Sequence, residues 1–265
     1  MKLRSLPLLA LALSSVAACA QTGQITGIAH VAYRVTDLDR EVAFFQKLGY
    51  QQAFTVTSPA GKVTESFIKI NDRQFIELYP QADTTQPLGW MHVCYESDDL
   101  PALVTTLTAH ALNPEPSRKA GAGNLISSLK DPEGRVTEFT QYMPGSRHTL
   151  DKGLHLGEHR ISDEMLGFSL PVPDIQAARK FYTTGMGFAA RDTKTGLRVT
   201  LSGVRIQLRP AASGIVPETT FHVADTAKAM QQLQALGLTP RQDGNRVLVT
   251  DPDGNVFAYI SPRPR

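Results

Sequence analysis

The chain has 265 residues, 42% of them hydrophobic and 20% charged, and this length gives a soft expectation of about two domains. The composition is that of an ordinary globular protein and excludes a disordered, collagen-like or disulfide-built chain. Its 27 basic and 25 acidic residues give a net charge of +2, which falls to zero without Lys2 and Arg4 in a segment that we expect to be removed. Because no basic excess remains to neutralise phosphates, nucleic acid is not an expected partner.

Residues 1–20 have the pattern of an export signal. A short basic start at 1–4 precedes an apolar run at 6–13 that is too short to span a bilayer, and small residues follow. The residues before Cys19 resemble the lipobox of bacterial lipoproteins, in which that cysteine is lipidated and begins the mature chain, although ordinary cleavage that discards it is the alternative. We therefore expect an exported protein that is periplasmic, or that contacts the membrane only through a lipid anchor at Cys19. In both cases Cys94 is the only thiol left, so no intramolecular disulfide is expected.

After residue 24, strand-like and helix-like segments follow one another in a regular order. Apolar or alternating runs at 27–35 and 90–97 predict strands, and each is followed by an aspartate that can cap a helix. Helices are predicted over 39–48 and 100–110, where apolar residues recur on one face. Shorter strands are predicted after each helix, at 53–57, 65–70, 74–79, 125–129 and 136–142. Each unit therefore has the order βαβββ.

The same unit returns in the second half of the chain. Residues 35–38 (Val-Thr-Asp-Leu) are matched by 172–175 (Val-Pro-Asp-Ile), and the turn at 131–134 (Asp-Pro-Glu-Gly) is matched by 251–254 (Asp-Pro-Asp-Gly). Such internal similarity indicates that one structural unit is used repeatedly. Four units are expected, at approximately 25–83, 88–143, 165–211 and 215–263.

This duplicated pattern resembles the vicinal oxygen chelate superfamily, which includes glyoxalases, extradiol dioxygenases and bleomycin-resistance proteins. The resemblance covers nearly all of the chain after residue 24. It implies an α+β fold in which four βαβββ modules form two tandem domains, at 25–143 and 165–263, joined by a connector at 144–164. In that family two modules close around a cavity, and metal ligands come from the first and last strand of each module.

In the N-terminal half, all four of these family positions hold residues that can bind a metal. They are His30, Glu77, His92 and Glu138. Strand alternation lets each of them face the cavity while its neighbours pack against helices, and a carboxylate on an apolar strand is costly unless it is paired or metal-bound. Two imidazoles and two carboxylates suit one divalent ion, such as Zn, Ni, Co, Mn or Fe.

The C-terminal half is expected to be a degenerate copy. The repeat places Gly167, Gln207, Glu218 and Ala258 at the four ligand positions, and this set cannot make a comparable metal site. Only a pairing of the first module with the second completes a site, so we expect that pairing rather than one between the first module and the fourth.

Further residues share the inward face of these strands if the alternation is unbroken. We predict that they bind substrate, with Arg34 holding an anionic group, Phe75 and Trp90 forming an apolar wall, and Tyr79 and Thr140 beside them. A solvated strand end is the alternative for Arg34, and ordinary core packing is the alternative for the two wall residues. The connector contains three histidines that we expect at the surface or in packing contacts: His148, His155 and His159.

The ligand set looks most like that of the glyoxalases. The resemblance then implies that the metal binds two neighbouring substrate oxygens and stabilises an enediolate, while Glu77 or Glu138 acts as the general base. We therefore expect an exported, metal-dependent lyase or isomerase of a small substrate with vicinal oxygens. One alternative is an Fe(II) extradiol-type dioxygenase that uses His30, His92 and Glu138, and another is a non-catalytic binding protein of the bleomycin-resistance type. The oligomeric state is not indicated by the sequence.

Overall fold

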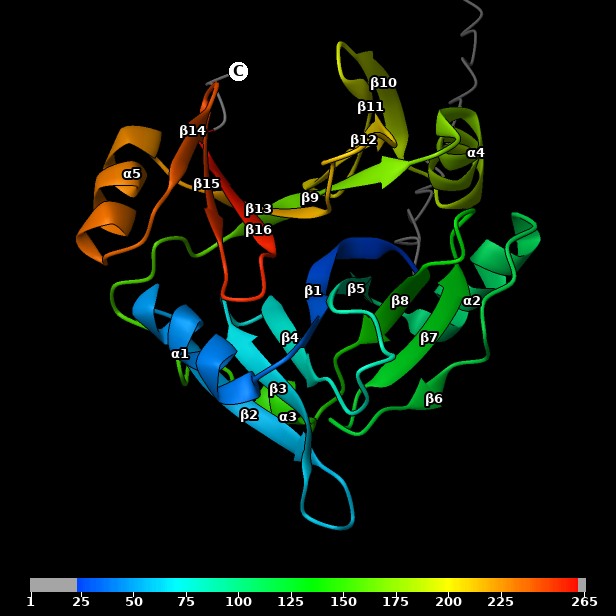
Figure 1. Cartoon of the computed structure of the whole chain (residues 1–265). Coiled ribbons are helices and arrows are strands. Elements are labelled where there is room, and N and C mark those ends of the chain that lie inside the picture. Colours follow the sequence, from blue (N-terminus) through cyan, green and yellow to red (C-terminus); the bar gives the residue numbers. More distant parts are fainter. Residues whose placement is uncertain (1–22, 262–265) are drawn as a thin grey trace, which may run out of the picture.

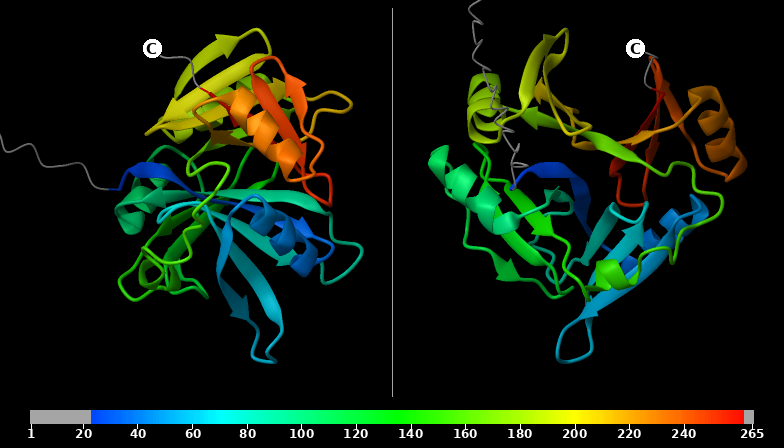
Figure 2. Two further views of the ribbon diagram at one scale, coloured as in Figure 1. Left: turned by 90° about the vertical axis from the view of Figure 1, so that its left-hand side faces the viewer. Right: turned by 180° about the vertical axis from the view of Figure 1, so that it is seen from behind.

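The computed structural model describes residues 23–261, so the expected export segment and Cys19 lie outside the described residues. These residues form two curled, eight-stranded sheets that open in opposite directions (Figures 1 and 2). The central strands β1 (Ile25–Val35) and β9 (Met165–Val172) lie next to each other where the two sheets meet. No helix within residues 23–261 is both long and apolar enough to cross a membrane.

The N-terminal sheet contains the first two modules. Its further elements are α1 (Leu38–Lys47), β2 (Gln51–Thr57), β3 (Val63–Lys69), β4 (Phe75–Pro80), β5 (Gly89–Ser97), α2 (Leu100–Ala109), β6 (Arg118–Lys119), β7 (Leu125–Lys130) and β8 (Val136–Gln141). The strand order is β2-β3-β4-β1-β5-β8-β7-β6, with β1 and β5 antiparallel at the centre. The expected pairing of the first module with the second is therefore confirmed.

The C-terminal sheet repeats this arrangement. Its elements after β9 are α4 (Ile175–Lys180), a π-helical turn η1 (Phe181–Gly185), β10 (Ala189–Thr193), β11 (Gly196–Leu201), β12 (Val204–Pro210), β13 (Glu218–His222), α5 (Thr226–Ala235), β14 (Arg241–Asp243), β15 (Arg246–Thr250) and β16 (Val256–Ile260). The strand order β10-β11-β12-β9-β13-β16-β15-β14 has the same connectivity as the first sheet. The α+β fold of two tandem domains built from four βαβββ modules is thus confirmed.

An aspartate stands before the long helix of each module and explains why the helix begins there. Its carboxylate accepts hydrogen bonds from free backbone N–H groups of the first turn, which no residue inside the helix can accept. These aspartates are Asp37, Asp99, Asp174 and Asp225.

The two domains share one continuous apolar core. Phe257 on β16 packs against Phe45 of α1, with ring centroids 5.4 Å apart, and against Tyr33 of β1 at the same separation. The hydroxyl of Tyr33 is also 2.5 Å from that of Thr219 on β13. These contacts fix the C-terminal domain against the helix and strand that begin the first module.

After β8 the connector first enters the open end of the N-terminal sheet and then passes the end of α1 on its way to β9. The short helix α3 (Arg147–Leu150) lies inside the opening of this sheet (Figures 1 and 2). The fully buried Lys69 on β3 holds the segment in place, because its ammonium group is 2.8 Å from a carboxylate oxygen of Asp151. Further along, a Cβ on Gly157 would lie only 1.7 Å from the carbonyl oxygen of Gly49, so this close passage requires glycine.

Candidate metal centre

The four predicted ligands lie on the four adjacent strands at the centre of the N-terminal sheet. His30 is on β1, Glu77 on β4, His92 on β5 and Glu138 on β8, and these strands pair in the order β4-β1-β5-β8. Both histidines and Glu77 are buried, and the side chain of Glu138 is 18% exposed. His30 and Glu77 are 47 positions apart in sequence, and His92 and Glu138 are 46 apart. The two residues of each pair come together because the first and last strands of each module pair side by side.

Their functional atoms converge on one point. The Nε2 atom of His30 lies 3.2 Å from Nε2 of His92 and 3.0 Å from Oε2 of Glu77. Glu138 Oε2 is 3.6 Å from the His30 nitrogen and 3.5 Å from the His92 nitrogen, and the His92 nitrogen is 3.6 Å from Glu77. All five separations therefore fall between 3.0 and 3.6 Å.

These separations fit a shared metal ion. Ligand atoms bound to one ion at about 2.0–2.2 Å lie about 2.8–3.6 Å apart in tetrahedral or octahedral geometry. Glu77 Oε2 is buried beside the two histidine nitrogens but accepts no hydrogen bond of good geometry from them, which is costly for a carboxylate unless a cation binds it. Nitrogen and oxygen donors in equal number suit a divalent transition ion, so the residues present fit the metal that the resemblance implies.

Without a bound metal ion, the two histidines tend to take up protons, because the neighbouring carboxylates favour positive charge on them. Burial acts to lower the pKa of His30, but the negative charges of Glu77 and Glu138 outweigh it and raise this pKa to about 10. The same two carboxylates raise the pKa of His92 against the effect of burial. Burial also opposes ionisation of the acids, yet the histidines lower the pKa of Glu138 to about 2 and that of Glu77 still further. The four side chains thus form a site that binds positive charge.

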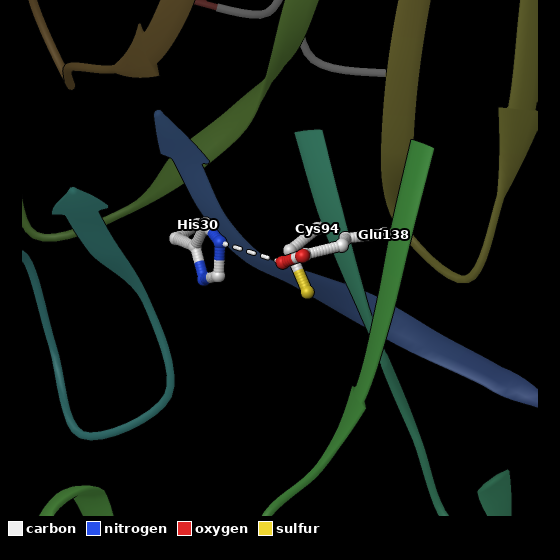
Figure 3. Close-up of side chains that lie close together, drawn as sticks. All are labelled: His30, Cys94 and Glu138. Carbon is white, nitrogen blue, oxygen red and sulfur yellow. Dashed lines mark ion pairs between the residues drawn. The ribbon is translucent and has the colours of Figure 1, made fainter. Parts of the chain in front are cut away.

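Cys94 lies beside this site on β5. It pairs with His30 on one neighbouring strand and with Glu138 on the other, and the three side chains meet on one face of the sheet (Figure 3). The thiol is fully buried, and this burial raises its pKa well above the ordinary value. It is therefore a neutral group next to the ligands.

A cavity of about 160 Å³ opens onto the ligands from the concave side of the sheet. Its size suits a small molecule rather than a polymer. The residues that line it include three of the ligands, His30, Glu77 and Glu138. Of the predicted substrate-binding residues, Tyr79 and Thr140 line this cavity.

The structure does not bring the other predicted substrate-binding residues to the cavity. The guanidinium of Arg34 donates a hydrogen bond to the carbonyl of Pro87 at the strand end, and Trp90 packs against Phe168 of the C-terminal domain. Phe75 is fully buried beneath the cavity lining. For Trp90 the reason is a bulge: Ala32 pairs with His92 and Tyr33 with Trp90, which leaves Met91 as an extra residue and breaks the alternation.

Sequence reasoning missed several cavity residues. They are Glu65 on β3, Arg118 on β6, Tyr142 and His148. His148 was expected at the surface or in packing contacts. It does pack, between Tyr142 and Phe75 at ring separations of 5.0 and 4.8 Å, but it also lines the cavity.

Glu65 was detectable from the sequence, because it is two residues before the inward-facing Phe67 on the same strand. Its pKa is raised to about 7, first by burial and then by the charge of Glu77.

The second sheet has no such site at the equivalent place. Glu218, the counterpart of His92, forms ion pairs with Arg209 at 3.0 Å and Arg246 at 2.6 Å. Gly167 and Ala258 supply no donor side chain at two other positions. The degenerate character expected for this half therefore agrees with its side-chain contacts.

Comparisons with known proteins agree with the fold and its duplication. Two family models of the glyoxalase/bleomycin resistance protein/dioxygenase superfamily match this chain, one at residues 29–127 and the other at 164–259. A lactoylglutathione lyase from Arabidopsis thaliana is 28% identical over 174 residues, which cover 60% of this chain and 61% of that protein. The chain thus spans between about half and three-fifths of the curated relatives that it matches.

Two solved structures have a similar fold. The Mn(II)-bound glyoxalase from Novosphingobium aromaticivorans has a TM-score of 0.66 at 19% identity, with 90% of this chain and 82% of that chain covered. The 2,3-dioxygenase LapB from Pseudomonas sp. KL28 also has a TM-score of 0.66, at 17% identity, with 89% of this chain and 93% of that chain covered. At these identities the similarity concerns the fold alone.

Proposed function

Because the chain belongs to the glyoxalase/bleomycin resistance protein/dioxygenase superfamily, we propose that its N-terminal domain is a metal-dependent lyase or isomerase of the glyoxalase type. The observation that carries this proposal is the presence of two carboxylates, Glu77 and Glu138, each within 3.6 Å of both histidine nitrogens. A two-histidine, one-carboxylate site needs only one of them. The second carboxylate is available for proton transfer.

The four ligands would hold the ion through His30, His92, Glu77 and Glu138. A divalent ion bound there polarises the substrate oxygens that it contacts and makes the neighbouring C–H group more acidic. Of the two carboxylates, Glu138 is the one that we assign to proton transfer. Its side chain is 18% exposed to the cavity, whereas that of Glu77 is 4% exposed and its carboxylate is the nearer of the two to His30.

The remaining cavity residues define the substrate. Phe67 and Tyr79 provide an apolar wall that excludes water, and the hydroxyl of Thr140 is held by a hydrogen bond to the carbonyl of Leu125. Arg118 is exposed at the rim, where its charge can attract an anionic group. A small oxygenated compound with one anionic end fits this lining.

The test is turnover by metal-loaded protein. We expect conversion of 2-oxoaldehyde thiol adducts or hydroxyacyl compounds without oxygen consumption, and loss of that turnover in Glu138→Gln. Glu158→Gln, at an exposed connector position, is the matched control and should behave as the wild type. Oxygen uptake with catechols would instead establish the dioxygenase, for which His30, His92 and Glu138 form the required triad. Retention of all four ligands disfavours a metal-free binding protein.

We also propose export, which rests on the sequence of residues 1–20 alone. Lipidation at Cys19 predicts that the protein sediments with membranes and that Cys19→Ser releases it into the soluble periplasmic fraction. Recovery of the wild-type chain in the soluble periplasm would favour ordinary cleavage, and recovery with an intact N-terminus in the cytoplasm would refute export.

A further inference from the structure

The concave face of the C-terminal sheet has a different chemistry from that of the N-terminal sheet. Because the two sheets share strand order and pairing registers, each position in one has a counterpart in the other. Five large apolar or aromatic residues on the inward-facing side of the N-terminal sheet are Phe54, Phe67, Phe75, Tyr79 and Ile126. Their counterparts, in the same order, are Arg191, Arg198, Arg205, Arg209 and Arg246. Every one of the five is an arginine.

These arginines point away from the core. On β11 and β12 the alternate residues Leu197, Val199, Ile206 and Leu208 are almost completely buried. The residues between them face the other side, and of these Arg198 and Arg205 are exposed. Since Gln207, the counterpart of the ligand Glu77, lies on the same side, the arginines occupy the face that corresponds to the metal site.

Two acidic side chains fix part of this cluster without neutralising it. Each oxygen of the buried Glu218 binds one arginine, Arg209 from β12 and Arg246 from β15. Arg246 also pairs with Asp243. Arg209 keeps an Nε atom with no hydrogen-bond partner. Glu218 thus links two arginines from opposite sides of the curled sheet and holds their donor groups in position.

Three other arginines lack any acidic partner. Within residues 23–261, Arg191, Arg198 and Arg205 form no ion pair, and Arg198 makes only a 3.4 Å contact with the amide oxygen of Gln207. Arg191 and Arg198 are direct cross-strand partners. Like charges placed opposite each other destabilise a sheet, so this arrangement costs folding free energy. Consistent with this, burial and the charges of Arg191 and Arg205 lower the pKa of Arg198.

We propose that the concave face of the C-terminal sheet, formed by Arg191, Arg198, Arg205, Arg209 and Arg246, binds a small molecule that carries two or more negative charges. Guanidinium groups match phosphate and carboxylate oxygens with paired, charge-assisted hydrogen bonds. A bound polyanion would remove the repulsion among the three unpaired arginines. The curved surface, with arginines on both of its sides, suits a compact ligand rather than a flat membrane or an extended polymer.

The duplication explains how such a site can arise in a copy that lost its metal ligands. In the first sheet Glu65, Glu77 and Glu138 make the concave face attractive to a cation. In the second, arginines replace the five apolar or aromatic residues, and the ligand positions hold Gly167, Gln207, Glu218 and Ala258. The sign of the charge on the face is therefore reversed, and the second site is independent of the enzymatic proposal for the first.

The test is calorimetric titration of the full chain, kept metal-free with a chelator at low ionic strength, with inorganic pyrophosphate and separately with citrate. We expect one-to-one binding of at least one of them, weakened by added salt. The double variant Arg198→Gln/Arg205→Gln should bind at least about tenfold more weakly, because each charge-assisted hydrogen bond is worth about that factor. Tighter binding of pyrophosphate would indicate a phosphorylated ligand, and tighter binding of citrate a polycarboxylate.

Two control variants show whether anion binding is specific to the concave face of the C-terminal sheet. Lys228→Gln removes a positive charge from the exposed surface of α5 and should leave the affinity unchanged. Glu77→Gln changes the metal site and should also leave it unchanged. Removal of Arg198 relieves repulsion, so the melting temperature of the ligand-free double variant should not fall. Absence of binding by both anions, or equal affinity of the double variant and wild type, would overturn the proposal.

Discussion

Metal binding to the N-terminal site should depend steeply on pH over a range where ordinary histidines no longer titrate. In the metal-free protein Glu77 and Glu138 raise the pKa of His30 to about 10. A metal ion binds the deprotonated imidazole, so binding must displace this proton. Because the group is protonated below its raised pKa, the apparent affinity should increase as the pH rises towards 10.

The size of this pH dependence follows from the His30 pKa of about 10. With one proton displaced, affinity rises about tenfold per pH unit, and at pH 7 the competition costs about 1,000-fold, or roughly 4 kcal/mol. His92 also has a raised pKa, so the number of protons released should lie between one and two. An unperturbed histidine with a pKa near 6.5 would give almost no pH dependence above about pH 7.5.

The assay is calorimetric titration of apoprotein with Zn²⁺ or Mn²⁺ between pH 6 and 8.5, in pairs of buffers with different ionisation enthalpies, which count the protons released. In Glu77→Gln the pH dependence should level off at a lower pH, since the charge of Glu77 is the main factor that raises the His30 pKa. The affinity reached at high pH should also be weaker because one ligand is lost. An affinity that does not change between pH 7.5 and 8.5 in the wild type would refute this reasoning.

Three further predictions concern stability. Burial raises the pKa of Glu41 to about 8. The free energy of unfolding of the wild type, measured with urea, should therefore fall by at most about 5 kcal/mol between about pH 4.5 and 8. Glu41→Gln should show no such fall. Lys69→Met removes the buried ammonium group that pairs with Asp151 and with Asp72, while His155 still contacts Asp151, and should cost up to about 3–5 kcal/mol by chemical denaturation; a cost below about 1 kcal/mol would contradict a stabilising role of this ammonium. Tyr33→Phe removes the hydroxyl contact with Thr219 between the domains and should lower the unfolding free energy by about 1–2 kcal/mol; an unchanged melting temperature would show that this contact contributes nothing.

The fold was predictable because several independent signals in the sequence agree. The repeated motifs indicated duplication, the aspartates that follow the strands at 27–35 and 90–97 indicated where the helices of the first two modules begin, and strand alternation allowed the ligand-type residues to share one face. The four ligand positions were implied by the family resemblance, and their convergence requires only module closure and local alternation around each residue. For that reason the structure brings all four together.

Other parts of the site depended on features that the sequence pattern does not display. A bulge at Met91 broke the alternation that had placed Trp90 on the inner face. Arg118 lies on β6, a strand of two residues that has no recognisable pattern. His148 belongs to the connector, and its entry into the cavity depends on the contact between Lys69 and a residue 82 positions away.

The central claim is that His30, Glu77, His92 and Glu138 together bind one divalent ion. Its most direct test is the metal content per chain, measured by elemental analysis after loading and desalting, for the wild type, His92→Ala and the control His222→Ala in the C-terminal domain. We predict one ion in the wild type and in His222→Ala, and a content near zero in His92→Ala. A wild type without metal, or equal metal in all three proteins, would contradict this account.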